Sequence, residues 1–117
     1  MEQLNKEAYT VGSDRLIYDA SHPIDGTIIK VTLPGTEETK IERGQIIDHK
    51  DGVFSMHADS GVASTIAAET VIAEKGVTEI ELEAYTSGTF RADATVSAVE
   101  LTDADIQGLR EKGIYLK

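Results

Sequence analysis

The chain has 117 residues and a formal net charge of −10, from 21 acidic and 11 basic residues, and it contains no cysteine. This length predicts a single domain, and the negative charge argues against nucleic acid or an anionic membrane as a partner. The lack of cysteine excludes disulfides and thiolate zinc sites, and no apolar run approaches the ~18 residues that a membrane helix needs.

The first 22 residues are predicted to form a flexible arm ahead of a β-rich domain that covers residues 23–117. The arm begins with polar residues that show no sustained periodicity and lack the apolar stretch of a signal peptide. A short apolar patch follows, and the proline after it disfavours a helix. This patch either packs on its own domain or contacts a partner, as a strand added to another chain's sheet edge. The residues assigned to the partner contact are Arg15, Leu16, Ile17, Tyr18 and Pro23.

Residues 27–33 are mostly β-branched and end at a Pro-Gly turn, which predicts the first core strand. Its buried face is expected to carry Ile29, Val31 and Leu33. Residues 36–40 are predicted to be a polar connector. Residues 45–49 and 53–57 are extended segments on either side of a Lys-Asp-Gly turn, and they predict a hairpin.

The segment 62–73 is ambiguous, because its alanines permit a helix while its β-branched residues favour strands; extended structure is predicted. The segment 77–96 has the clearest alternation in the chain. It predicts a half-buried strand whose exposed face carries Glu79, Glu81 and Glu83. A turn or bulge is predicted at the Ser-Gly pair 87–88, followed by a second alternating run.

The last element is predicted to be a helix from about Asp103 to Lys112. Thr102 is a natural N-cap, and Asp105 lies in an approximate capping-box position near the positive end of the helix dipole. Gly113 is expected to end the helix in the left-handed conformation. These local features agree with one another, so a short C-terminal helix is predicted.

The sequence YTSGTFR at residues 85–91 resembles the strand, SGTFR turn and strand of the head decoration proteins of lambda-type bacteriophages. Two further segments resemble the same family in the same order: RGQII at residues 43–47, and the terminal segment 101–115. Together they span about two thirds of the chain, and residues 16–23 resemble the leader that precedes the domain in such proteins. The residues of the family-motif turn are Ser87, Gly88, Thr89 and Phe90.

This resemblance implies a mainly β, α+β fold: a small β-tulip-like domain with a short C-terminal helix and an extended N-terminal arm. It further implies homotrimers on the outer surface of the expanded virion capsid, made in the cytoplasm of the bacterial host. Their arms would contact the major capsid protein, and the trimers would stabilise the capsid against the pressure of packaged DNA.

The sequence contains none of the common catalytic or nucleotide-binding motifs. The chain lacks a nucleophile elbow, HExxH, a Walker A loop and GxGxxG, so we predict no enzyme and no cofactor. A metal site can be imagined from the histidines and nearby aspartates, and His49 and His57 are expected on paired strands of the hairpin. Their spacing fits no closed zinc pattern, so surface polar residues are predicted instead. The residues of the metal-site alternative are His22, His49, His57, Asp48, Asp51 and Asp59.

Two other functions stay open from the sequence alone. One is another virion structural protein, such as a tail or fibre-base component, because such proteins also use small β-rich trimers. The other is a small ligand-binding β-domain or an oligomeric hydrolase. A pocket lined by convergent polar groups would favour that second alternative.

Overall fold

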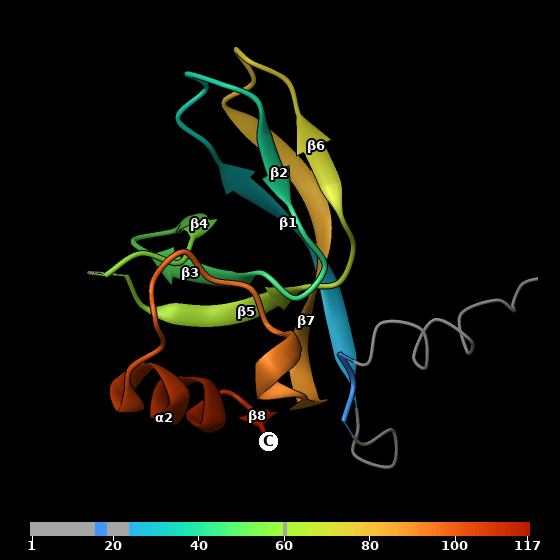
Figure 1. Ribbon diagram of the computed structural model, residues 1–117, viewed down its shortest axis with the longest axis vertical. Coiled ribbons are helices and arrows are strands. Elements are labelled where there is room, and N and C mark those ends of the chain that lie inside the picture. Colours follow the sequence, from blue (N-terminus) through green and yellow to red (C-terminus); the bar gives the residue numbers. More distant parts are fainter. Residues whose placement is uncertain (1–15, 19–23, 60) are drawn as a thin grey trace, which may run out of the picture.

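A computed structural model describes residues 16–18, 24–59 and 61–117 (Figure 1). Arg15, His22 and Pro23 lie outside the described residues, as does most of the predicted arm. Within these described ranges the fold is mainly β with one short α-helix, as predicted. Its elements are β1 (Asp25–Thr32), β2 (Thr39–Ile41), β3 (Ile46–Lys50), β4 (Val53–Met56), β5 (Ala63–Ala67), β6 (Val71–Ala73), β7 (Glu79–Phe90), the 3-10 helix η1 (Ala92–Ala94), α2 (Asp103–Glu111) and β8 (Ile114–Leu116).

The main sheet is a small closed barrel of five strands in the order β1-β4-β3-β5-β7, with β8 added beside β7. Antiparallel pairing of β1 with β7 closes the barrel and extends along the whole of β1. The contact between β1 and β4 is parallel and rests on one pair, Val31 with Phe54. Strands β2 and β6 form a separate antiparallel ribbon that lies against the upper part of β1 and β7 (Figure 1).

Strand β7 is the longest strand and pairs with β1, β5 and β8. Its first half confirms the predicted alternation, because Leu82 and Ala84 are buried while the three glutamates are exposed. Of the two alternatives predicted at Ser87 and Gly88, the turn is wrong, since β7 continues to Phe90, whereas a bulge-like irregularity is present close by. The register with β1 is irregular one residue earlier, where Asp25 faces Ser87 but the next residue faces Tyr85.

Gly88 is required for packing within β7. It adopts a φ of 142°, and a Cβ atom there would lie 2.8 Å from Cζ of the Phe90 ring. A side chain would therefore displace a fully buried ring. The second alternating run predicted after Phe90 is also wrong, because residues 92–94 form the 3-10 helix η1.

Two hydrophobic clusters fill the molecule. The upper core lies between the β2–β6 ribbon and β1 with β7, and consists of Ile29, Val31, Leu33, Ile41, Ile47, Ala67, Ala73, Leu82 and Ala84. The lower core lies between the barrel, α2 and β8, and consists of Leu16, Ile17, Ile46, Ala63, Ile66, Phe90, Leu109 and Ile114. The predicted inward face of the first strand is thereby confirmed.

The ribbon explains two differences from the sequence predictions. The connector predicted at residues 36–40 already enters β2 at Thr39, because Ile41 must reach the upper core. The ambiguous segment 62–73 is extended, as predicted, but it divides into β5 in the barrel and β6 in the ribbon. One continuous strand could not serve both sheets, since β5 pairs with β3 and β7 whereas β6 pairs with β2.

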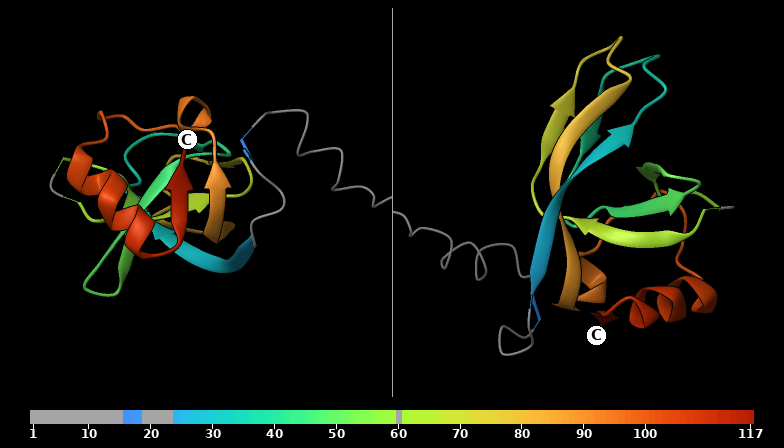
Figure 2. Two further views of the ribbon diagram at one scale, coloured as in Figure 1. Left: turned by 90° about the horizontal axis from the view of Figure 1, so that it is seen from below. Right: turned by 180° about the vertical axis from the view of Figure 1, so that it is seen from behind.

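The hairpin and the helix are confirmed. β3 pairs with β4 in antiparallel register, and the turn uses Asp51 and Gly52 with φ of 53° and 80°, as expected for two left-handed turn residues. Thr102 and Asp105 form a complete capping box, and Gly113 follows the helix with φ of 93°. The helix lies across the lower end of the barrel (Figure 2), where Leu109 enters the lower core.

Candidate interaction site at the end of strand β7

Residues 16–18, here called the leader strand, lie along the C-terminal end of β7. The backbone amide of Tyr18 donates to the carbonyl of Thr89 at 2.9 Å, and the amide of Arg91 donates to the carbonyl of Leu16 at 2.7 Å. Ile17 forms an antiparallel bridge with Phe90 between these bonds. The other edge of β7 pairs with β8, so this part of β7 lies between the leader strand and β8.

This arrangement brings together the two groups of residues that the sequence analysis singled out. Leu16 and Ile17 are buried in the lower core with Phe90, so these two side chains pack on their own domain. Tyr18 is 49% exposed, and the guanidinium of Arg91 lies over its ring, 5.2 Å from the centroid. Arg15 and Pro23, the other residues assigned to the partner contact, lie outside the described residues.

The residues of the family-motif turn form a strand. Gly88, Thr89 and Phe90 pair with the three residues of β8, and all three are buried. The hydroxyl of Ser87 accepts a hydrogen bond from the backbone amide of Asp25 at 3.2 Å. The turn-forming residues 87–90 therefore serve close packing and a strand junction.

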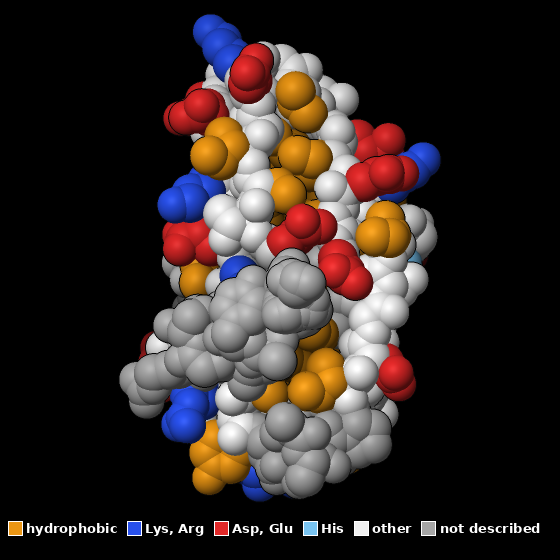
Figure 3. Space-filling model, turned by 90° about the vertical axis from the view of Figure 1, so that its right-hand side faces the viewer, with side chains coloured by type: hydrophobic (Ala, Val, Ile, Leu, Met, Phe, Trp, Pro, Cys, Tyr) orange, Lys and Arg blue, Asp and Glu red, His pale blue; other side chains and the backbone are white. Residues whose placement is uncertain are grey.

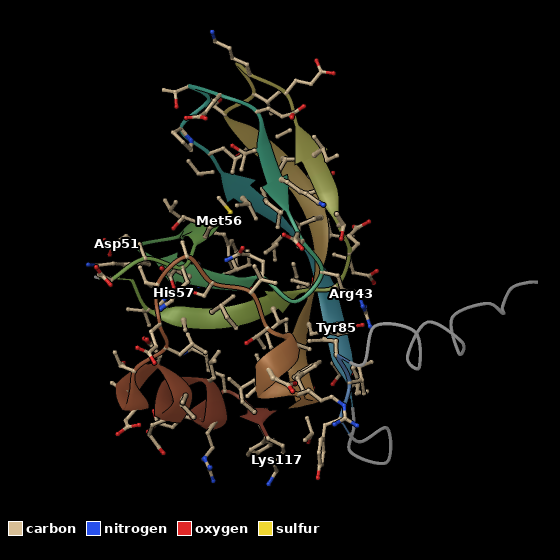
Figure 4. All side chains as sticks on the ribbon, viewed as in Figure 1. Arg43, Asp51, Met56, His57, Tyr85 and Lys117 are labelled. Atoms are coloured by element: carbon tan, nitrogen blue, oxygen red, sulfur yellow. The ribbon has the colours of Figure 1, made fainter. Side chains whose placement is uncertain are left out.

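Arg43 is a further residue of this region that sequence reasoning did not single out. Its guanidinium donates to the hydroxyl of Tyr85 at 2.6 Å and to the carbonyl of Ala68 at 2.8 Å, and Figure 4 shows Arg43 and Tyr85 side by side. These bonds join the entry of the β3 hairpin to β7. Both residues belong to the segments that carry the family resemblance, which was the one available indication of their role.

The imagined metal site does not assemble. His49 is exposed and stacks on Phe54, with ring centroids 4.1 Å apart. His57 is buried, and its Nδ1 lies 2.6 Å from Oδ1 of Asp48 while its Nε2 lies 3.1 Å from Oδ2 of Asp105. Among the described residues, no group of three His, Cys, Asp or Glu side chains is arranged to hold a metal ion.

His57 instead joins the hairpin to the helix, and Figure 4 shows it above the N-terminal end of α2. His57 can donate to Asp48 and Asp105 at the same time only when both of its ring nitrogens carry protons. Asp48 also accepts from the amide of Ala58 at 3.0 Å, and a Cβ atom on Gly61 would overlap its carboxylate. The prediction that His57 and Asp48 are surface polar residues is therefore wrong, since both are buried.

Asp105 makes the fold sensitive to acid. Burial raises the pKa of its carboxyl, but the hydrogen bonds with Thr102 and the neighbouring His57 together lower the pKa by more than burial raises it. The pKa therefore lies below its ordinary value of 3.8. Such a group stabilises the fold above its unfolded pKa and loses this contribution as the pH falls through the folded pKa. We therefore expect the free energy of unfolding to decrease as the pH is lowered below 3.8.

Urea unfolding measured from about pH 6 to about pH 2 checks this expectation. Asp105→Asn should lose less stability than the natural chain over the acidic part of this range. Asp103→Asn, which changes an exposed carboxyl in the same helical turn, is the matched control. Identical pH profiles for the natural chain and Asp105→Asn would contradict the assignment.

The described helices include none that is long and apolar enough to cross a membrane. No family model matches the chain, and no curated protein sequence matches it either.

Proposed function

We propose that this chain is a phage or prophage head decoration protein, which binds the outside of the expanded capsid as trimers and stabilises it against the pressure of packaged DNA. The observation that carries the proposal is the pairing of the leader strand with residues 89–91 at the end of β7, because it joins two separate segments of the family resemblance. We also propose that the barrel and its ribbon correspond to the β-tulip domain of that family.

The position of the leader strand supports an arm that acts outside the domain. Leu16 and Ile17 anchor it in the lower core, so the preceding residues are tethered at one end of the molecule. At the same place Tyr18 exposes an aromatic ring, and the partly buried Arg91 holds its guanidinium over that ring. The major capsid protein is the proposed partner of this end, in the virion, after synthesis in the host cytoplasm.

The surface chemistry supports a structural role on the outside of a particle. Glu79, Glu81 and Glu83 project from β7 as a solvated acidic row, and Figure 3 shows acidic side chains spread among hydrophobic ones on one side of the molecule. A net charge of −10 repels nucleic acid and keeps a coated particle soluble. Trimers would let three weak arm contacts act together through effective concentration.

Binding to undecorated expanded capsids of a lambda-type phage tests the proposal. We expect the full chain to co-sediment with these capsids at a saturating stoichiometry when mixed at micromolar concentration. Deleting residues 2–14 keeps Leu16 and Ile17, so the fold should persist while capsid affinity drops by about tenfold or more. Ile72→Glu, an exposed change on the distant β6, should leave affinity unchanged.

Three outcomes of this experiment count against the proposal or its details. Failure of the full chain to bind at micromolar concentration would contradict a decoration role. Normal binding by the truncated chain would remove the arm from the mechanism. Labelling of intact particles that places the protein on the tail would favour the other virion structural role instead.

A further inference from the structure

A mostly apolar groove lies at the lower end of the molecule, between η1, the loop that follows it, α2 and β8. Its volume is about 400 Å³, within the range of small-molecule and peptide side-chain sites. We call it the base groove, and it is lined by Ala92, Thr95, Ser97, Val99, Glu100, Leu101, Ile106 and Leu116. Val99, Leu101 and Ile106 are each only half-buried, so the groove leaves apolar surface in contact with water.

The apolar surface of this groove is what an occupant would bury. Val99, Leu101 and Ile106 come from the loop and from α2, and they face the groove together with Ala92 and Leu116. An occupant with apolar side chains would remove this surface from water, which is favourable in proportion to the area buried.

The leader strand places a specific occupant beside this groove. Because it runs antiparallel to β7, the chain traced backwards from Tyr18 to Leu16 follows β7 from Thr89 to Arg91. The next residue after Arg91 is Ala92, which lines the groove. Fifteen residues precede Leu16, and at about 3.3 Å per residue they can span about 50 Å, which exceeds the longest dimension of the molecule, 38 Å.

We propose that residues 1–15 occupy the base groove of their own chain when no partner is bound. This segment supplies apolar side chains at Met1, Leu4, Tyr9 and Val11, which suit the lining of the groove. Its tether converts binding into an intramolecular step with an effective concentration in the millimolar range, so weak contacts are enough. The inference does not depend on the capsid proposal, although a partner that binds the arm would have to displace it from the groove.

A single spin label tests this occupancy on the full chain. Because the chain has no cysteine, Asn5→Cys provides one attachment point for a nitroxide. We expect the NMR signals of Val99, Ile106 and Leu116 to broaden several-fold more than that of Ile72 on the distant ribbon. Equal broadening of Ile72 and the groove residues, or none, would overturn the proposal.

Variants of the groove provide the second arm of the test. Leu101→Asp, and Val99→Asp as an independent change, should reduce the broadening at Ile106 and Leu116 several-fold. Val53→Asp, an exposed apolar residue on β4, is the matched control and should leave it unchanged. Broadening that persists in both groove variants would contradict the assigned site.

A mixing experiment shows whether the bound segment belongs to the same chain or to a second copy. Isotope-labelled chains without a nitroxide are mixed with unlabelled chains that carry it. We expect no broadening in this mixture, because the occupant belongs to the same chain. Broadening at the groove residues would show that a second copy supplies the segment, and would overturn the intrachain assignment. Loss of capsid binding would change none of these results, so the two proposals fail separately.

Discussion

Replacing His57 with alanine is expected to lower the free energy of unfolding by roughly 3–5 kcal/mol, the cost of breaking a buried charge network. The imidazole links Asp48 on β3 to Asp105 in the first turn of α2, at 2.6 and 3.1 Å. Without it, the buried Asp48 carboxylate loses its side-chain partner, and the helix loses its polar connection to the hairpin. Urea unfolding monitored by circular dichroism measures the change.

His49→Ala is the matched control for this prediction. His49 lies on the same hairpin but is exposed, and its ring stacks on Phe54. We expect this change to cost less than about 1 kcal/mol, as for most surface substitutions. If the two histidine variants lost the same stability, the proposed link between hairpin and helix would be refuted.

Replacing Leu16 with alanine is expected to cost about 2–5 kcal/mol, the usual range for a buried leucine. The side chain is 1% exposed and packs in the lower core. Tyr18→Ala removes an exposed ring and one cation-π contact with Arg91, which is worth about 0.5–1 kcal/mol. The same unfolding measurement compares the two variants of the leader strand.

This comparison decides where the folded domain begins. A large loss for Leu16→Ala and a small loss for Tyr18→Ala would place the leader strand within the cooperative unit. Equal and small losses would instead mean that residues 16–18 contribute nothing to folding and belong to the arm. For the proposed function, the first result means that only the residues before Leu16 are available to a partner.

The two parts of the candidate site were predicted from sequence, but their contact was not. The apolar patch at Leu16 and the segment ending at Phe90 are separated by most of the chain, and no local pattern pairs them. Antiparallel pairing between such segments depends on where the whole sheet brings them. The same reason explains why His57 was assigned to the surface, because its partner Asp105 is 48 residues away.

Where interactions act within a few residues, the sequence was sufficient by itself. The alternation of β7, the Asp51-Gly52 turn and the capped helix α2 are all determined by contacts between near neighbours. Only the tertiary structure decided the barrel order, the separate ribbon of β2 and β6, and the strand β8 after Gly113. It also decided that the glycine at position 88 serves close packing against Phe90 within a strand. These features depend on which distant surfaces must be buried together, and a short segment of sequence carries no information about its distant neighbours.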